Sequence, residues 1–229
     1  MSSLNSDAYS AVLFDLDGTL VDTAPDMVAV LQSLQSDHGV EPVSYELGRS
    51  YVSNGAVGLL RLGFPDAGDD AIEELRHAFL ERYADQVCVR SSVFPGLDLL
   101  LEHLREVNRP WGVVTNKPQF LAEPLLDALK LLKTAVCCVS GDTLPLRKPH
   151  PAPLQHACEI GGLEVARTLY IGDSSRDIEA GRAAGMGTIA AAYGYITPDD
   201  DATTWGADAI ASNTQELAQI VLKAVNLGA

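Results

Sequence analysis

Short apolar runs alternate with longer amphipathic segments along most of the 229-residue sequence. The runs are rich in β-branched and aromatic residues, and the segments between them place leucines at helical spacing. The predicted strands span residues 11–14, 111–116, 135–139, 168–172, 187–191 and 208–210. The predicted helix over residues 97–107 has Leu99, Leu100, Leu101 and Leu104 on its apolar side. Regular alternation of this kind predicts an α/β fold with a doubly wound parallel sheet.

The first apolar run ends in two carboxylates, Asp15 and Asp17, which are followed by Gly18. Residues two apart on a strand share a side, so the two carboxylates leave the strand end close together, and Gly18 lets the chain turn there. Neighbouring carboxylates repel each other unless a cation or an electrophilic phosphoryl group offsets their charge. We therefore predict a bound Mg²⁺ at this strand end, because Mg²⁺ takes oxygen ligands.

Two further predicted strands also end in polar residues, Thr115 and Asn116 at one and Asp173 and Asp177 at the other. The carboxyl ends of parallel strands border the crevice where doubly wound sheets bind ligands. Lys148, in a loop between these strands, is placed to offset negative charge. Each group also has an ordinary alternative when taken singly. The strand-end residues can cap helices, and Lys148 can be an exposed loop lysine.

In this order and at these separations, the polar groups resemble the four motifs of the haloacid dehalogenase superfamily of phosphatases. Those motifs are an Asp-x-Asp pair, a strand-end Ser or Thr, a Lys, and a Gly-Asp-x-x-x-Asp cluster. The resemblance covers nearly the whole chain and implies a Rossmann-like core that carries the catalytic residues.

The resemblance also implies a role for each residue. Asp15 would attack phosphorus and form an aspartyl-phosphate, and Asp17 would protonate the leaving oxygen and then activate water. Thr115 and Lys148 would complete the catalytic set by holding and neutralising the phosphoryl group. The implied substrate-binding residues in the core are Gly18, Thr115, Asn116 and Lys148. The implied Mg²⁺ ligands are Asp15, the carbonyl oxygen of Asp17, Asp173 and Asp177, the last as a ligand or as a hydrogen-bond partner of one.

Residues 23–91 interrupt the alternation with charged segments of helical spacing. We predict that they form an α-helical cap domain inserted into a core domain of residues 1–22 and 92–229. Ser53 and Asn54 break the helical pattern, and the resemblance places a substrate-reading cap loop near them. We therefore predict that Ser53, Asn54 and Arg49 bind substrate. The alternatives are a simple turn between helices and a surface arginine.

The net charge of −15 disfavours nucleic acids and anionic membranes as partners. The expected partner is a small phosphorylated metabolite, drawn to a site that Mg²⁺ and Lys148 make locally positive. Four cysteines, Cys88, Cys137, Cys138 and Cys158, lack metal-binding spacing and are expected to be buried free thiols.

The polar residues 1–10 lack the features of a signal segment, and no apolar run approaches the ~18 residues of a membrane span. We expect a cytoplasmic monomer or homodimer.

The leading hypothesis is a Mg²⁺-dependent phosphomonoester hydrolase. Within the family, the cap and the motifs most resemble phosphoglycolate phosphatases. Residues 111–118 and 193–196, together with 205–208, look equally like N-acetylmuramic acid 6-phosphate phosphatases. A sugar phosphomutase shares all four motifs. A dehalogenase is disfavoured, because its chemistry needs neither the metal-binding residues nor an acid at position 17, and this sequence has both. A non-catalytic phosphate-binding module is the alternative outside enzymes.

Overall fold

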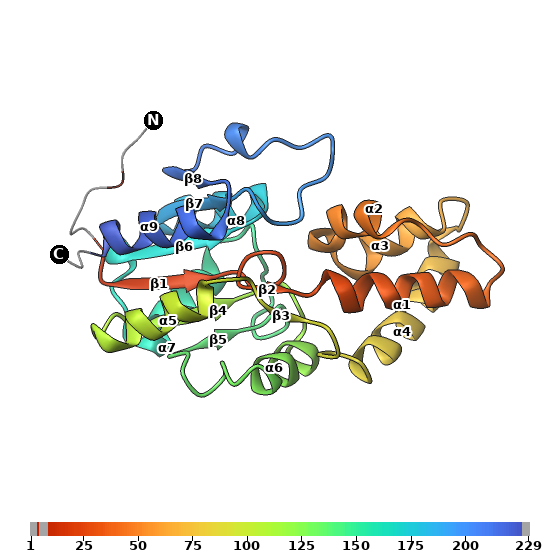
Figure 1. Cartoon of the computed structure of the whole chain (residues 1–229), viewed down its shortest axis with the longest axis horizontal. Helices are drawn as coiled ribbons and strands as arrows, with labels where there is room; N and C mark the ends of the chain where they lie inside the picture. Colours follow the sequence, from red (N-terminus) through yellow and green to blue (C-terminus); the bar gives the residue numbers. More distant parts are fainter. Residues whose placement is uncertain (1–3, 5–8, 226–229) are drawn as a thin grey trace.

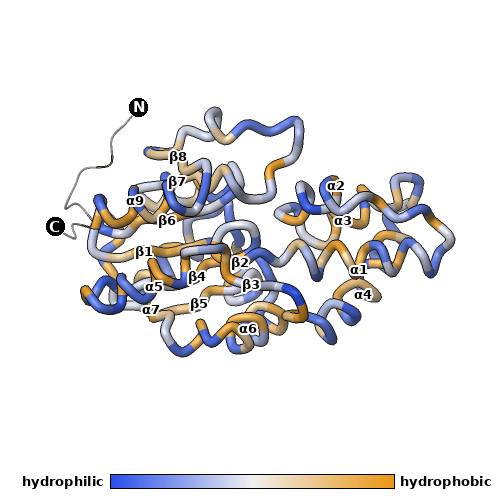
Figure 2. Tube along the Cα trace, viewed as in Figure 1, coloured by the Kyte–Doolittle hydropathy of each residue, from blue (hydrophilic) through white to orange (hydrophobic). Residues whose placement is uncertain are grey.

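The computed structural model describes Leu4 and residues 9–225. Most of residues 1–10, for which the sequence predicts no signal segment, therefore lie outside the described residues. Six parallel strands form one sheet in the order β5-β4-β1-β6-β7-β8. Their bounds are β1 Ala11–Phe14, β4 Trp111–Val114, β5 Cys138–Val139, β6 Thr168–Gly172, β7 Gly187–Ala191 and β8 Ala209–Ala211. In Figure 2 much of the strands β1, β4 and β5 is drawn in the orange of hydrophobic residues, as expected of strands that are covered on both faces.

Helices cover both faces of this sheet (Figure 1). Phe14 belongs to a core cluster that contains Leu97 and Leu217, and the adjacent Leu13 belongs to a second cluster with Leu154 and Ala180. Because successive strand residues point to opposite faces, one layer is supplied by α5 and α9 and the other by α7 and α8. The core helices are α5 Leu97–Glu106, α6 Gln119–Ala128, α7 Ala152–Gly161, α8 Ser175–Ala184 and α9 Thr214–Ala224. This arrangement confirms the predicted doubly wound α/β class.

The helices that follow the first strand gather to one side of the sheet (Figure 1). They are α1 Ala24–Asp37, α2 Tyr45–Ser50, α3 Gly55–Gly63 and α4 Asp69–Ala84, with a 3₁₀ turn at Val52–Asn54. The chain leaves the core through β2, Val21–Asp22, and returns through β3, Ser92–Val93. These two segments pair antiparallel, with Asp22 opposite Ser92. The predicted domain boundaries lie next to this ribbon, and the division into a core domain and a cap domain stays a prediction.

Some local predictions were wrong. The third strand is limited to β5, because residues 132–136 form turns before it. Leu99 is 67% exposed, since it lies on the outer side of α5, whereas Leu100 and Leu104 are buried as predicted. All four cysteines are free, but only Cys137 and Cys158 are buried, and Cys88 and Cys138 are half-buried. In the described part of the chain, no helix combines the length and the apolar character needed to cross a membrane.

Candidate active site

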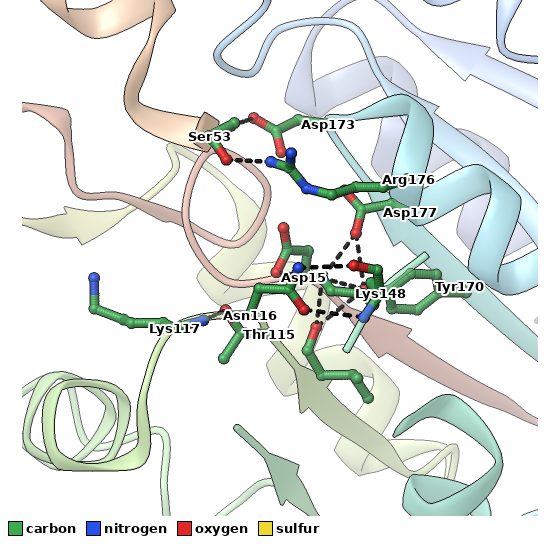
Figure 3. Close-up of polar contacts among 11 residues, drawn as sticks. Asp15, Ser53, Thr115, Asn116, Lys117, Lys148, Tyr170, Asp173, Arg176 and Asp177 are labelled. Atoms are coloured by element: carbon green, nitrogen blue, oxygen red, sulfur yellow. Dashed lines mark hydrogen bonds and ion pairs between the residues drawn. The ribbon is translucent and has the colours of Figure 1, made fainter. Parts of the chain in front are cut away.

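The carboxyl ends of three adjacent strands bring the predicted residues together. Asp15 follows β1, Thr115 follows β4 and Asp173 follows β6. The chain continues from β1 toward β4 and from β6 toward β7, in opposite directions across the sheet. A crevice for ligands forms where strand connections diverge in this way. Figure 3 shows the polar side chains that meet there.

Lys148 is the central cation of this cluster. Its Nζ lies 2.8 Å from Oδ1 of Asp15 and 2.7 Å from Oδ1 of Asp177. It also donates to the Tyr170 hydroxyl at 2.7 Å and to the Val114 carbonyl oxygen at 3.0 Å. Burial by itself lowers the pKa of Lys148, but the two carboxylates outweigh it and hold that pKa above its ordinary value. Lys148 is therefore a buried cation at neutral pH and not an exposed loop lysine.

Asn116 fixes the segment that carries Lys148. The Asn116 Nδ2 donates to the Lys148 carbonyl oxygen at 3.0 Å, and its Oδ1 accepts from the Lys148 amide at 3.1 Å. The hydroxyl of buried Thr115 accepts from the Lys117 amide at 3.1 Å, and Thr115 lines the same cavity as Asp15. The Asn116 side chain thus positions the lysine. Binding of phosphoryl oxygens by Thr115 and by the Asn116 backbone stays a prediction.

Asp15, Asp173 and Asp177 form a cluster in which one oxygen from each carboxylate lies within 4.8 Å of the others. Burial raises the pKa of Asp15 to about 6 against the lowering effect of Lys148, and Asp177 adds to the increase. Burial, followed by the charges of Asp15 and Asp177, raises the pKa of Asp173 to about 8. The raised pKa values of Asp15 and Asp173 show that these two groups resist being ionised together, and a bound cation would relieve that repulsion.

The donor set fits a hard divalent cation. Among the described residues, Oδ1 of Asp173 and Oδ2 of Asp177 are buried side-chain oxygens without a hydrogen-bond partner. Leaving such oxygens unsatisfied is costly, and a cation with oxygen ligands removes that cost. The Asp17 carboxylate lies outside the cluster that the described residues form. For Asp17, the sequence interpretation assigned only the carbonyl oxygen to the metal.

Asp17 has separate partners. Its Oδ1 accepts from the Thr23 hydroxyl at 2.6 Å and lies 2.9 Å from Nζ of Lys117. Lys117 also donates to the hydroxyl of Tyr83, a residue of α4, at 3.1 Å. Burial lowers the pKa of Lys117, but Asp17 and Tyr83 more than offset this and raise it above its ordinary value. A buried ammonium therefore joins the predicted acid–base residue to the cap.

The turn after β1 needs glycine at position 18. Gly18 has φ +82°, and a Cβ atom there would collide with the Asp173 carboxylate and the Tyr195 ring. Its amide donates to the Val21 carbonyl oxygen at 3.0 Å. The predicted sharp turn is present, and the amide of Gly18 is already engaged within it.

The three predicted cap residues have different surroundings. Ser53 donates from its hydroxyl to Oδ2 of Asp173 at 2.7 Å. Asn54 lines the cavity above Asp15. The guanidinium of Arg49 instead donates to the carbonyl oxygens of residues 193 and 194 at 3.2 Å, and Arg49 is not one of the described residues that line the cavity. Substrate contacts by these residues stay predictions.

A cavity of about 310 Å³ lies between the cap and the strand ends. Its cap wall is mainly apolar and includes Val52, Val57, Phe79 and Leu80. Its cationic lining residues are Arg76, Lys117, Arg147, Lys148 and Arg176, and its acidic ones are Asp15 and Asp17. A chain with 31 acidic and 16 basic residues therefore presents a cationic cavity, which suits an anionic substrate.

Sequence reasoning missed several residues of this site. Lys117 directly follows the predicted phosphate-binding residues, so its position after a strand end was a usable signal. Arg176 lies inside the Asp173–Asp177 motif, and its guanidinium donates to the backbone carbonyl of Ser53. The cap residue Tyr83 gave no signal, because only the fold brings α4 against Lys117.

Comparisons with known proteins identify the family of this chain. Residues 12–191 match the family model described as haloacid dehalogenase-like hydrolase. A curated relative from Pseudomonas putida, named N-acetylmuramic acid 6-phosphate phosphatase, is 42% identical over 212 residues, which are 92% of this chain and 95% of the relative. A second from Xanthomonas campestris pv. campestris, named phosphoglycolate phosphatase, is 40% identical over 207 residues, 90% and 94% of the two chains.

A solved structure from Haemophilus somnus, described as a predicted phosphoglycolate phosphatase, superposes with a TM-score of 0.82. It is 27% identical in sequence, and the match covers 93% of this chain and 98% of that chain. The likeness therefore extends through both the sheet and the helices α1–α4.

Proposed function

The chain belongs to the haloacid dehalogenase-like hydrolases, and we propose that it hydrolyses a small phosphomonoester, with Mg²⁺ as cofactor and Asp15 as nucleophile. One observation carries this proposal. The Asp15 carboxylate lies 2.8 Å from buried Lys148 and within 4.8 Å of the carboxylate oxygens of Asp173 and Asp177, at the floor of a cationic cavity. The names of the curated relatives, both phosphatases, support it.

In the first step an oxygen of Asp15 bonds to phosphorus while the ester P–O bond breaks. The Lys148 ammonium contacts both Asp15 and Asp177. It is proposed to favour the ionised form of Asp15 and to neutralise the charge that develops on the phosphoryl oxygens during transfer. Thr115 is proposed to hold a phosphoryl oxygen through its hydroxyl proton, since that hydroxyl already accepts from the Lys117 amide.

Asp17 is proposed to give its proton to the leaving oxygen, which leaves the phosphoryl group on Asp15. Asp17 then takes a proton from the water that attacks phosphorus, as the bond between phosphorus and the Asp15 oxygen breaks and inorganic phosphate is released. The Thr23 hydroxyl and the Lys117 ammonium fix its carboxylate in one orientation. When bound, Mg²⁺ would be held by Asp15, Asp173, Asp177 and the carbonyl oxygen of Asp17, and would neutralise the transferring phosphoryl group.

Two substrates follow from the relatives' names, phosphoglycolate and N-acetylmuramic acid 6-phosphate. Both carry a carboxylate besides the phosphate, and Arg76 and Arg147 line the cavity as candidate partners for it. The apolar cap wall favours the larger substrate, because it offers surface to the acetyl and lactyl groups that phosphoglycolate lacks.

The test is hydrolysis of p-nitrophenyl phosphate with Mg²⁺, with EDTA, and by Asp15→Asn. We expect the wild type to turn over the substrate with Mg²⁺, and we expect no turnover in EDTA or by Asp15→Asn. Turnover that survives EDTA or Asp15→Asn would contradict the mechanism. Relative kcat/KM for the two named phosphates then identifies the substrate. A sugar phosphomutase would instead form an isomeric sugar phosphate faster than it releases phosphate.

A further inference from the structure

The Asp173 carboxylate divides its two oxygens between different neighbours. Oδ2 accepts from the Ser53 hydroxyl at 2.7 Å and from the Tyr195 amide at 2.8 Å. Oδ1 is buried and, among the described residues, has no hydrogen-bond partner. Two donors on one oxygen fix the rotation of the carboxylate, so the other oxygen is held ready for the cation that Asp15 and Asp177 also face.

One of these two donors comes from the cap. Ser53 lies in the 3₁₀ turn Val52–Asn54 and is separated by 120 residues from Asp173 in the sequence. The core holds this turn from a second direction, because Arg176 donates to the Ser53 carbonyl oxygen (Figure 3). The contact therefore depends on the position of the cap as well as on the local conformation of the turn.

Neighbouring contacts reinforce the same placement. Arg49 of the cap donates to the carbonyl oxygens of Tyr193 and Gly194, and its guanidinium lies 4.9 Å from the centre of the Tyr195 ring. The Tyr195 hydroxyl in turn donates to Asp22 at 2.6 Å, in the strand through which the chain leaves the core. The amide that bonds Asp173 thus belongs to a loop that the cap and its linker both contact.

We propose that Ser53 is a positioning residue for the metal site: its hydroxyl orients Asp173, so that the protein binds its divalent cation more tightly when the cap contacts the core. The inference rests on the proposed Mg²⁺ site and differs from the substrate-reading role predicted for Ser53. Linkage makes the coupling reciprocal, so the bound cation must stabilise the cap contact by the same factor.

The experiment measures Mn²⁺ binding to the full-length protein without substrate, from the electron paramagnetic resonance signal of free Mn²⁺. Ser53→Ala should weaken Mn²⁺ binding about 10-fold, the usual scale for losing a hydrogen bond to a metal ligand. Ser53→Thr keeps a hydroxyl and should restore binding. Ser50→Ala is the matched control, because the Ser50 hydroxyl bonds, among the described residues, only to the Leu47 carbonyl oxygen of its own helix at 2.8 Å.

Hydrogen exchange gives a second readout. Mg²⁺ should slow amide exchange in the turn Val52–Asn54 of the wild type and of Ser50→Ala, and should do so less in Ser53→Ala.

Equal Mn²⁺ affinity in Ser53→Ala and the wild type would overturn the proposal, as would equal weakening by Ser53→Ala, Ser53→Thr and Ser50→Ala. A wild type that binds no Mn²⁺ would remove the metal site itself, and with it both the proposed function and this inference. Normal wild-type binding that is unaffected by Ser53→Ala removes the inference alone.

Discussion

Two buried lysines divide the carboxylates of the site between them. Lys148 contacts Asp15 and Asp177, and Lys117 contacts Asp17. Each lysine is charged, because the carboxylates offset the cost of burial. The pairing separates the predicted nucleophile from the predicted acid–base residue, so that the two have different electrostatic surroundings although one residue lies between them.

Lys117→Met is expected to impair proton transfer more than phosphoryl binding. The substitution keeps most of the side-chain volume but removes the ammonium that orients Asp17. We expect kcat/KM to fall about 100-fold for an alkyl phosphate, at the low end of what general acid catalysis contributes. The loss should be smaller for p-nitrophenyl phosphate, whose leaving group needs little protonation. Steady-state kinetics on both substrates measure the difference.

Lys133→Met is the control for that experiment, because Lys133 is exposed and is not among the described residues that line the cavity. It should leave both rates unchanged. An equal loss on the alkyl and the p-nitrophenyl substrates in Lys117→Met would show that Lys117 acts on phosphoryl binding and not through Asp17.

The cap is joined to the core by two chain segments that one carboxylate holds together. Asp26, in the first turn of α1, accepts from the amides of Val89, Arg90 and Ser91 and from the Ser91 hydroxyl. These residues precede β3, through which the chain returns to the sheet. The outgoing and returning segments are therefore locked to each other next to the ribbon of β2 and β3.

Asp26→Ala is expected to destabilise the protein by about 3 kcal/mol, because it leaves buried donors without an acceptor. Asp37→Ala is the matched control. Asp37 pairs with Arg82 at 2.8 Å, but its side chain is 54% exposed, so its loss should cost at most about 0.5 kcal/mol. Urea unfolding measures both values. Similar midpoints for the two variants would contradict the role given to Asp26.

Periodicity was enough to predict the class of the fold and the positions of the six strands of the sheet, although the third was predicted too long. The carboxyl-end rule for parallel sheets also placed Asp15, Thr115 and Asp173 at one edge. Contacts between cap and core were beyond that reasoning, because Tyr83 meets Lys117, and Ser53 meets Asp173, only after the helices pack. No local pattern in the sequence encodes that packing. The exposed side of α5 was missed for a related reason, since a run of leucines does not say which one faces outward.

The whole molecule combines a strongly negative chain with a cationic cavity. Four of the cationic lining residues, Lys117, Arg147, Lys148 and Arg176, come from the core, and Arg76 comes from the cap. The acidic cluster beneath them opposes folding when it is ionised, because burial raises the pKa of Asp173 to about 8. A cation at this cluster would therefore stabilise the entire protein.

Mg²⁺ is therefore expected to stabilise the protein to an extent that depends on pH. An acid whose pKa is higher in the folded than in the unfolded protein loses its stabilising contribution as pH rises between the two values. In EDTA, Tm should fall from about pH 5 to about pH 8, and Mg²⁺ should raise Tm most at the upper end. Asp173→Asn should flatten the profile and remove most of the Mg²⁺ effect. Calorimetry at several pH values provides the test, and a Mg²⁺ shift that grows toward acid pH would contradict the prediction.

The central claim is that the phosphoryl group passes through Asp15. The most direct measurement is mass spectrometry of the protein quenched in acid during turnover with Mg²⁺ and then digested. We expect one added phosphoryl group on the peptide that contains Asp15, and none in Asp15→Asn or in EDTA. An unmodified Asp15 peptide during rapid phosphate release, or a phosphoryl group on another residue, would contradict it.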